Sequence, residues 1–128
     1  MANNYNELLE KLLKIANKFS FVIRSNYTIT EAEINILKSF EKYLLLETET
    51  ESWPGTILLY GKKARIFYYS FRQETFELLK KASNDLYEWQ HPEKPEDLCF
   101  YCDEKPVFAS ISHERDCFFI GDDECSRE

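Results

Sequence analysis

The stretch that most constrains the fold is residues 98–120, which read LCFYCDEKPVFASISHERDCFFI. Aromatic and β-branched residues dominate this stretch, and such residues favour extended strands. Polar residues typical of turns interrupt the apolar runs at 103–106 and again at 113–116. Three apolar runs joined by two short polar breaks predict a three-stranded antiparallel meander.

Three segments upstream of the meander have the spacing of amphipathic helices. In residues 4–18 the apolar side chains recur at every third or fourth position, which places them on one face of a helix. Residues 30–44 and 71–89 show the same spacing. We therefore predict a helix over each of these segments.

The second and third helices begin with the pattern of a capping box, in which a hydroxyl and a carboxylate or amide three residues later satisfy each other's backbone N–H groups. The pair is Thr30 and Glu33 in the second helix, and Ser70 and Gln73 in the third. This pattern favours a capping role for Glu33 over a role as a catalytic acid.

Strand signals lie between the helices. Residues 19–23 form a short apolar run that predicts a strand, and residues 44–51 alternate Glu with Thr, which predicts an exposed strand or a loop. The apolar runs 57–60 and 64–69 are joined by a short loop that contains Gly61, and this arrangement predicts a central β-hairpin.

Two short segments carry turn and breaker residues. In Trp53-Pro54-Gly55-Thr56 the Pro and Gly suit the central positions of a type II turn. Residues 90–95 contain two prolines, which disfavour helix and predict an extended connection to the meander.

The predicted order of elements is α-β-α-β-β-β-α-β-β-β, with strands clustered rather than separated by helices. Such an order is typical of α+β domains. We predict one domain over residues 1–128, with a mainly antiparallel sheet of about five to six strands and three helices packed against it. We expect an ordered core over about residues 4–121 and an acidic tail over 122–128.

The N-terminus lacks the basic-then-apolar order of a signal peptide, and no run approaches the roughly 18 apolar residues that span a bilayer. We therefore expect a cytoplasmic protein without membrane association. The net charge is −7, and its distribution is uneven: residues 85–128 hold 13 Asp and Glu against 4 Lys and Arg. Such an acidic block repels phosphates, which argues against nucleic-acid binding and favours a basic protein partner.

The four cysteines, Cys99, Cys102, Cys117 and Cys125, suggest an alternative role as a structural zinc-binding domain, with His113 as a substitute ligand. The first two are separated by Phe100-Tyr101, which lacks the Gly or Pro of a zinc knuckle. In a strand, these two thiols face opposite sides of the sheet. The spacing therefore favours small buried or reduced thiols, and we predict no cofactor or metal.

A second alternative is a small enzyme centred on His113, which lies near Ser110 and Ser112 and could act as a base toward a cysteine. Sequence neighbours on a strand point away from one another, so this arrangement needs convergence from elsewhere in the fold. We predict no catalytic residue and favour a non-enzymatic role.

Several short motifs resemble those of a group of small bacterial cytoplasmic proteins thought to include immunity proteins, which neutralise secreted toxin domains. The resemblance covers about residues 53–120 and rests on Trp53-Pro54-Gly55-Thr56, on Trp89 followed by Pro92, on Pro95-Glu96-Asp97-Leu98-Cys99-Phe100-Tyr101, and on Ser110-Ile111-Ser112-His113-Glu114. The chain departs from the group at Cys102-Asp103-Glu104-Lys105, where a Gly-containing turn is usual.

This resemblance implies that the chain binds a cognate toxin domain, and an acidic surface fits a toxin with a basic cleft. We therefore predict a partner-binding face in the acidic C-terminal third, with Tyr101 as its aromatic anchor. The predicted face consists of Glu96, Asp97, Tyr101, Asp103, Glu104, Glu114 and Asp116.

Overall fold

Six antiparallel strands in the order β2-β5-β1-β6-β7-β8 form the main sheet of the computed structural model, which describes residues 4–121. The strands are β1 (Lys18–Arg24), β2 (Leu44–Thr50), β5 (Ala64–Ser70), β6 (Glu96–Cys102), β7 (Lys105–Ile111) and β8 (Asp116–Phe119). A two-stranded hairpin consists of β3 (Ser52–Trp53) and β4 (Thr56–Ile57). The helices are α1 (Asn4–Ile15), α2 (Glu31–Phe40) and α3 (Gln73–Ala82), and the 3₁₀ turns are η1 (Glu41–Tyr43), η2 (Leu86–Glu88) and η3 (Ser112–Glu114). The predicted α+β fold and the β6–β7–β8 meander are confirmed.

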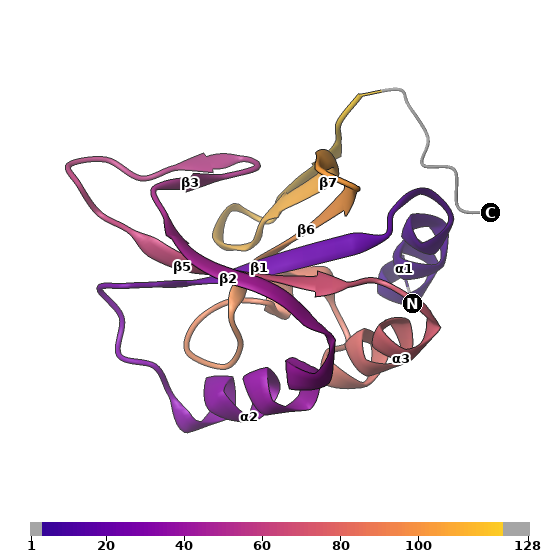
Figure 1. Ribbon diagram of the computed structural model, residues 1–128, viewed down its shortest axis with the longest axis horizontal. Helices are drawn as coiled ribbons and strands as arrows, with labels where there is room; N and C mark the ends of the chain where they lie inside the picture. The colour runs from indigo at the N-terminus through magenta and orange to yellow at the C-terminus, as the bar shows by residue number, and fades with distance from the viewer. Residues whose placement is uncertain (1–3, 122–128) are drawn as a thin grey trace.

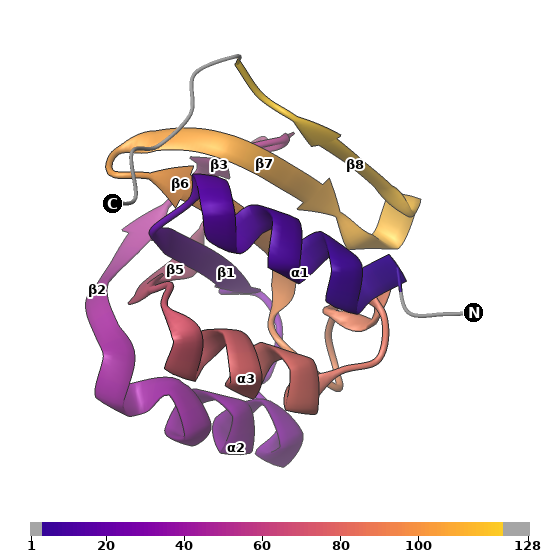
Figure 2. The same cartoon turned by 90° about the vertical axis from the view of Figure 1, so that its right-hand side faces the viewer.

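The three helices lie on one face of the main sheet, and the β3–β4 hairpin lies on the other (Figures 1 and 2). The central strand β1 shows why both faces are covered. Successive side chains of a strand point to opposite faces, so Phe19 and Phe21 pack in the core under the helices while Val22 packs in a smaller cluster with Trp53. Burial on both faces explains why residues 19–23 are apolar at every position except Ser20.

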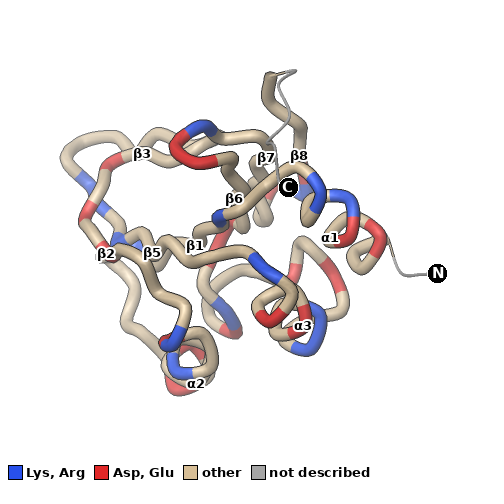
Figure 3. The backbone as a smooth tube through the Cα atoms, turned by 45° about the vertical axis from the view of Figure 1, so that its right-hand side comes forward, with Lys and Arg blue, Asp and Glu red and all other residues tan. Residues whose placement is uncertain are grey.

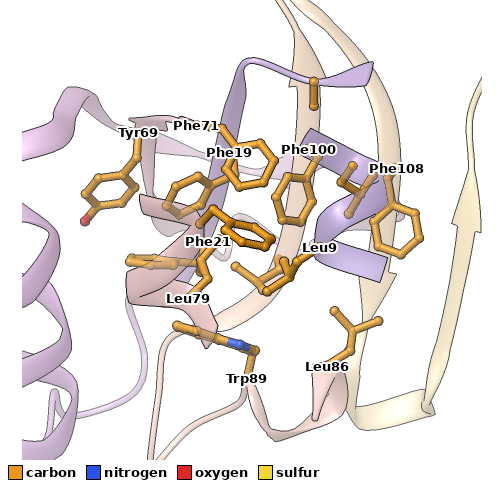
Figure 4. Packing of buried hydrophobic residues seen from close by; sticks show 14 of the residues in the cluster. Leu9, Phe19, Phe21, Tyr69, Phe71, Leu79, Leu86, Trp89, Phe100 and Phe108 are labelled. Atoms are coloured by element: carbon orange, nitrogen blue, oxygen red, sulfur yellow. The ribbon is translucent and has the colours of Figure 1, made fainter. Parts of the chain in front are cut away.

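The core under the helices is built largely from aromatic rings (Figure 4). Phe19 stacks on Tyr69 with 5.2 Å between ring centroids, and Phe21 stacks on Trp89 at 5.6 Å. The indole Nε1–H of Trp89 donates to the Tyr5 hydroxyl at 3.1 Å, and that hydroxyl donates to the carbonyl of Leu79 at 2.6 Å. Each buried ring contributes about 1.5–3 kcal/mol through removal of apolar surface from water, and the hydrogen bonds join α1 and α3 to the segment after α3.

Helix α2 begins as predicted. The Thr30 hydroxyl accepts the backbone N–H of Glu33 at 3.1 Å, and the Glu33 carboxylate accepts that of Thr30 at 3.0 Å. The same buried carboxylate lies 2.8 Å from Nδ1 of His91, whose ring stacks on Tyr27. The capping interpretation of Glu33 is confirmed, and its second oxygen additionally fixes the loop that contains His91.

The third helix differs from the prediction at both ends. Thr75 supplies the N-terminal side-chain contact in place of the predicted Ser70–Gln73 box, because its hydroxyl accepts the N–H of Arg72 at 2.9 Å and donates to the carbonyl of Ser70 at 2.8 Å. The helix ends at Ala82 rather than at residue 89. A polar Ser83-Asn84-Asp85 segment stops it, since short polar side chains compete for backbone hydrogen bonds; Asp85 instead caps η2 by accepting the N–H of Tyr87.

The predicted hairpin between residues 57–60 and 64–69 is wrong. The strand β5 is paired on one side with β1 and on the other with β2, so both of its edges are occupied. Residues 56–57 pair instead with 52–53, around the predicted Pro54–Gly55 turn, in which Gly55 has a φ of +93°. Residues 90–95 are also not extended, because the backbone N–H of Lys94 returns to the carbonyl of Gln90 and closes a turn.

Candidate functional site

The structure divides the predicted partner-binding residues into three groups. Glu96, Asp97 and Tyr101 are buried, with 4%, 0% and 5% of their surface exposed. Asp103 and Glu104 are exposed in the turn between β6 and β7, and Glu114 and Asp116 are exposed after β7. The length of β7 separates the Asp103–Glu104 pair from the Glu114–Asp116 pair. At about 3.3 Å per residue, that length is on the order of 20 Å.

The predicted face therefore needs correction, because the Glu96 and Asp97 carboxylates are buried and hydrogen-bonded within the protein, whereas Tyr101 is reached only through a cavity. Acidic positions of residues 4–121 are spread over several elements, as the backbone view of Figure 3 shows. The part of the prediction that the structure brings together is Tyr101 with Asp103 and Glu104, which line one small cavity.

The buried acids Glu96 and Asp97 hold the β3–β4 hairpin against the sheet. The Glu96 carboxylate accepts Nε–H of Arg24 at 2.8 Å, and the Arg24 guanidinium lies 5.4 Å from the Trp53 ring centroid. The Asp97 carboxylate accepts the Trp53 indole N–H at 3.0 Å and the backbone N–H of Ser112 at 2.9 Å. Burial raises the pKa of Asp97, and the two hydrogen bonds partly offset that rise.

Tyr101 lies at the floor of a cavity of about 230 Å³ on the sheet face that the helices leave open. Its hydroxyl lies 2.8 Å from the Ser20 hydroxyl, and its ring meets Tyr68 edge to face at 5.5 Å. Burial raises the pKa of Tyr101 and that of Tyr68, so both phenols stay neutral at physiological pH. We call this cavity the tyrosine hollow; it is lined by Lys18, Leu45, Leu46, Thr48, Tyr68, Tyr101, Asp103 and Glu104.

The acidic rim of the tyrosine hollow is held in place by Asn17. The Asn17 amide donates to the Asp103 carboxylate at 3.0 Å, and its carbonyl oxygen accepts the Asp103 backbone N–H at 2.8 Å. Asp103 has a φ of +57°, a left-handed conformation that Asp tolerates because its short side chain bonds locally. The neighbouring Glu104 side chain is 93% exposed and lies 3.6 Å from the Lys18 ammonium.

The opposite rim is apolar. Leu45 and Leu46 are 56% and 55% exposed on the edge strand β2, which pairs only with β5 among the described strands. The register places Lys18 opposite Tyr101, and Tyr68 opposite both Ser20 and Leu46. The hollow thus combines an aromatic floor, exposed leucines and a carboxylate rim. Tyr68 and the two leucines could not be assigned to this site from the sequence. They join Tyr101 only through cross-strand pairing, which leaves no pattern among neighbouring residues.

The described cysteines of the zinc alternative lie on two faces of the sheet. Cys99 packs in the cluster beneath the β3–β4 hairpin and donates to the carbonyl of Asp97 at 3.5 Å, and burial raises its pKa to about 12. Cys102 and Cys117 pack on the helix side of the sheet; Cys117 is a free thiol, whereas Cys102 is disulfide-bonded, so the expectation of reduced thiols is wrong for Cys102. Within residues 4–121 no group of three His, Cys, Asp or Glu side chains could hold a metal ion, and Cys125 lies outside the described residues.

His113 lies in an exposed position after β7, with its Nε2 atom 3.7 Å from a carboxylate oxygen of Glu114. The nearby Ser110 hydroxyl is buried and donates to the carbonyl of Leu98 at 2.8 Å. Among the contacts of the described residues, His113 pairs with neither a cysteine nor a serine.

No protein-family model, curated protein or solved structure matches the chain. None of the helices in the described part of the chain is both long enough and apolar enough to cross a membrane.

Proposed function

We propose that this chain is an immunity-type protein that binds and neutralises a toxin domain, and that the tyrosine hollow receives a basic side chain of that partner. The observation that carries this proposal is the meeting of an aromatic floor, exposed leucines and two carboxylates in one hollow. Tyrosine is enriched among residues that dominate binding energy at protein interfaces. The short-motif resemblance described above points to the same class of function.

The chemistry of the hollow suits lysine or arginine. The methylene stem of such a side chain can pack on Leu46 and Tyr68, while its charged end approaches Asp103 and Glu104. Lys18 already neutralises part of Glu104, so an arriving guanidinium, which binds carboxylates through two parallel hydrogen bonds, competes better than an ammonium. The net charge of −7 would speed encounter with a basic partner, and we expect that association rate to fall with salt.

Co-expression with the product of the neighbouring gene tests the function, with complex formation and relief of toxicity as readouts. The double variant Asp103→Asn/Glu104→Lys then tests the site, since Asn keeps the left-handed conformation and the acceptor for Asn17. We expect this variant to bind roughly 10- to 100-fold more weakly. Tyr68→Ala should weaken binding in the same direction.

The matched control is Glu114→Lys/Asp116→Asn, which changes the net charge equally at the other end of β7. We expect it to leave binding within about threefold of the unaltered chain. Equal weakening by both double variants would point to a general charge effect and reject the hollow as the contact. Absence of any complex and of any protection would reject the immunity function itself.

A further inference from the structure

A second cavity, of about 460 Å³, lies on the helix side of the sheet between α2 and the strands β1, β2 and β5. Its floor is made of Ile23, Phe67 and Tyr69, which are 7%, 6% and 1% exposed. Its rim carries Ile29, Ile34 and Leu44, which are about 40% exposed and would bury more apolar surface if the cavity were filled. We call this cavity the α2 groove; Leu37, Lys38, Glu41, Glu47 and Arg65 also line it.

Helix α2 has one stripe that packs into the core and a neighbouring stripe that lines the groove, where Leu37 also packs partly against the core. Glu33, Ile36 and Phe40 follow helical spacing and point into the protein, where Glu33 and Phe40 are fully buried. Ile34 and Leu37 occupy the neighbouring stripe, which continues through Lys38 and Glu41 and lines the groove. A helix needs one stripe to pack on its own core, so the second stripe forms an apolar wall that faces the groove.

The groove mouth carries the basic side chains of Lys38 and Arg65. Lys38 forms no ion pair with a carboxylate of residues 4–121, and its side chain is exposed. Arg65 is paired with Glu47 yet remains 60% exposed, and Arg24 is held by Glu96. Glu41 and Glu47 also line the groove, so Lys38 is its one lining cation without a carboxylate partner among residues 4–121. A ligand carboxylate can therefore bind Lys38 and share Arg65 with Glu47.

We propose that the α2 groove binds an unbranched aliphatic carboxylate, with its chain along Ile34, Leu37 and Phe67 and its head group at Lys38 and Arg65. The volume lies within the range of about 300–1,000 Å³ typical of small-molecule sites. This site is separate from the tyrosine hollow, which suits a cation, and it does not depend on the proposed immunity function.

The test titrates the full chain with dodecanoate below its micellar concentration and measures heat and amide chemical shifts. We expect a dissociation constant of roughly 1–100 µM, with shift changes at α2 and β5. Dodecyltrimethylammonium has the same chain with the opposite charge and should bind at least tenfold more weakly. Equal binding of the two would overturn the charged head-group site, and no binding of dodecanoate would overturn the proposal.

Variants place the ligand in the groove. Lys38→Glu should weaken dodecanoate binding about tenfold, while Lys42→Glu, one turn further along and outside the groove, should leave it unchanged. Equal losses in both would indicate a general charge effect and reject Lys38 as the contact. Ile34→Trp should fill the groove and abolish binding, with Ile34→Asp as a second variant and thermal unfolding as the check of folding. Unchanged affinity in a folded Ile34 variant would reject the groove.

Discussion

Asp97 illustrates how a single side chain changes role between sequence and structure. In the sequence it belongs to an acidic block and suggests an exposed binding face. In the fold it is fully buried, adopts a φ of +60°, and accepts hydrogen bonds from Trp53 and Ser112. The contact with Trp53 ties the β3–β4 hairpin to β6, so Asp97 stabilises the open face of the sheet beside the tyrosine hollow.

Replacing Asp97 with Asn should destabilise the fold by about 1–3 kcal/mol, because the amide can accept only one of the two N–H groups and turns its own donor toward the other. Burial raises the pKa of Asp97 above 3.8. At pH values between 3.8 and the raised pKa, the folded chain binds more protons than the unfolded chain. The contribution of Asp97 to the free energy of unfolding is therefore full below pH 3.8 and is lost as the pH rises through the raised pKa.

Asn does not titrate in this range, so the stability advantage of the unaltered chain over the variant should shrink as pH rises. Urea unfolding at pH values from about 4 to about 8 measures the difference. A difference in unfolding free energy between the two chains that grows with pH would contradict the raised pKa of Asp97.

The Ser20–Tyr101 hydroxyl pair gives a second prediction at this scale. Tyr101→Phe leaves the buried Ser20 hydroxyl without its partner and should cost about 1–2 kcal/mol in the free energy of unfolding. Adding Ser20→Ala to that variant should cost less than Ser20→Ala costs alone, since no orphaned hydroxyl remains. A double-mutant cycle by urea unfolding checks this, and strictly additive losses would show that the two hydroxyls are not coupled.

At the scale of elements, patterns among neighbouring residues predicted the structure correctly, whereas the pairing of strands that are distant in the sequence was not predicted. The capping box at Thr30 and the meander after residue 95 rest on neighbouring residues, and both are present. The hairpin expected at 57–69 failed because β5 has two longer partners, β1 and β2, that lie far away in the sequence. The third helix was predicted too long because its apolar spacing continues past the Ser83-Asn84-Asp85 stop, and Leu86 and Trp89 still reach the core.

The β3–β4 turn offers a test at the element scale. A Cβ on Gly55 would lie 3.2 Å from Cγ1 of Ile111, whereas one on Gly61 would meet nothing within 4 Å. Both glycines have positive φ, so Ala at either position carries backbone strain. We expect Gly55→Ala to lose about 1–3 kcal/mol of stability and Gly61→Ala to lose less. Thermal unfolding of the two variants checks the order, and a larger loss at Gly61 would contradict the close contact with Ile111.

For the whole molecule, strand order sets where stability is concentrated. The strand β1 lies between β5 and β6, and its five central residues are buried. The strand β8 lies at one edge of the sheet and has four residues, three of them exposed. We expect native-state hydrogen exchange to be slowest in β1 and fastest in β8, since local opening requires less loss of buried surface at an edge. Faster exchange in β1 than in β8 would contradict this order.

The candidate site shows how far sequence reasoning extends at this scale. Tyr101, Asp103 and Glu104 were predicted from one contiguous, distinctive stretch, and the fold keeps them together. Glu96 and Asp97 belong to the same stretch, but their partners Arg24 and Trp53 lie far away in the chain, so their burial could not be read from it. Tyr68 and Leu46 join the hollow only through strand pairing.

The outer edge of β2 has a consequence for how copies of the chain behave in concentrated solution. The exposed Leu44, Leu45 and Leu46 favour association through this edge. Glu47 and Glu49, which pair with Arg65 and Lys63, place acidic groups along it. Two such edges docked antiparallel would bring those glutamates together, and we expect the repulsion to disfavour such a dimer. In about 1 M salt the screening length falls to about 3 Å, and this protection fades. Adding salt to about this concentration should therefore promote dimers that pair through the β2 edge.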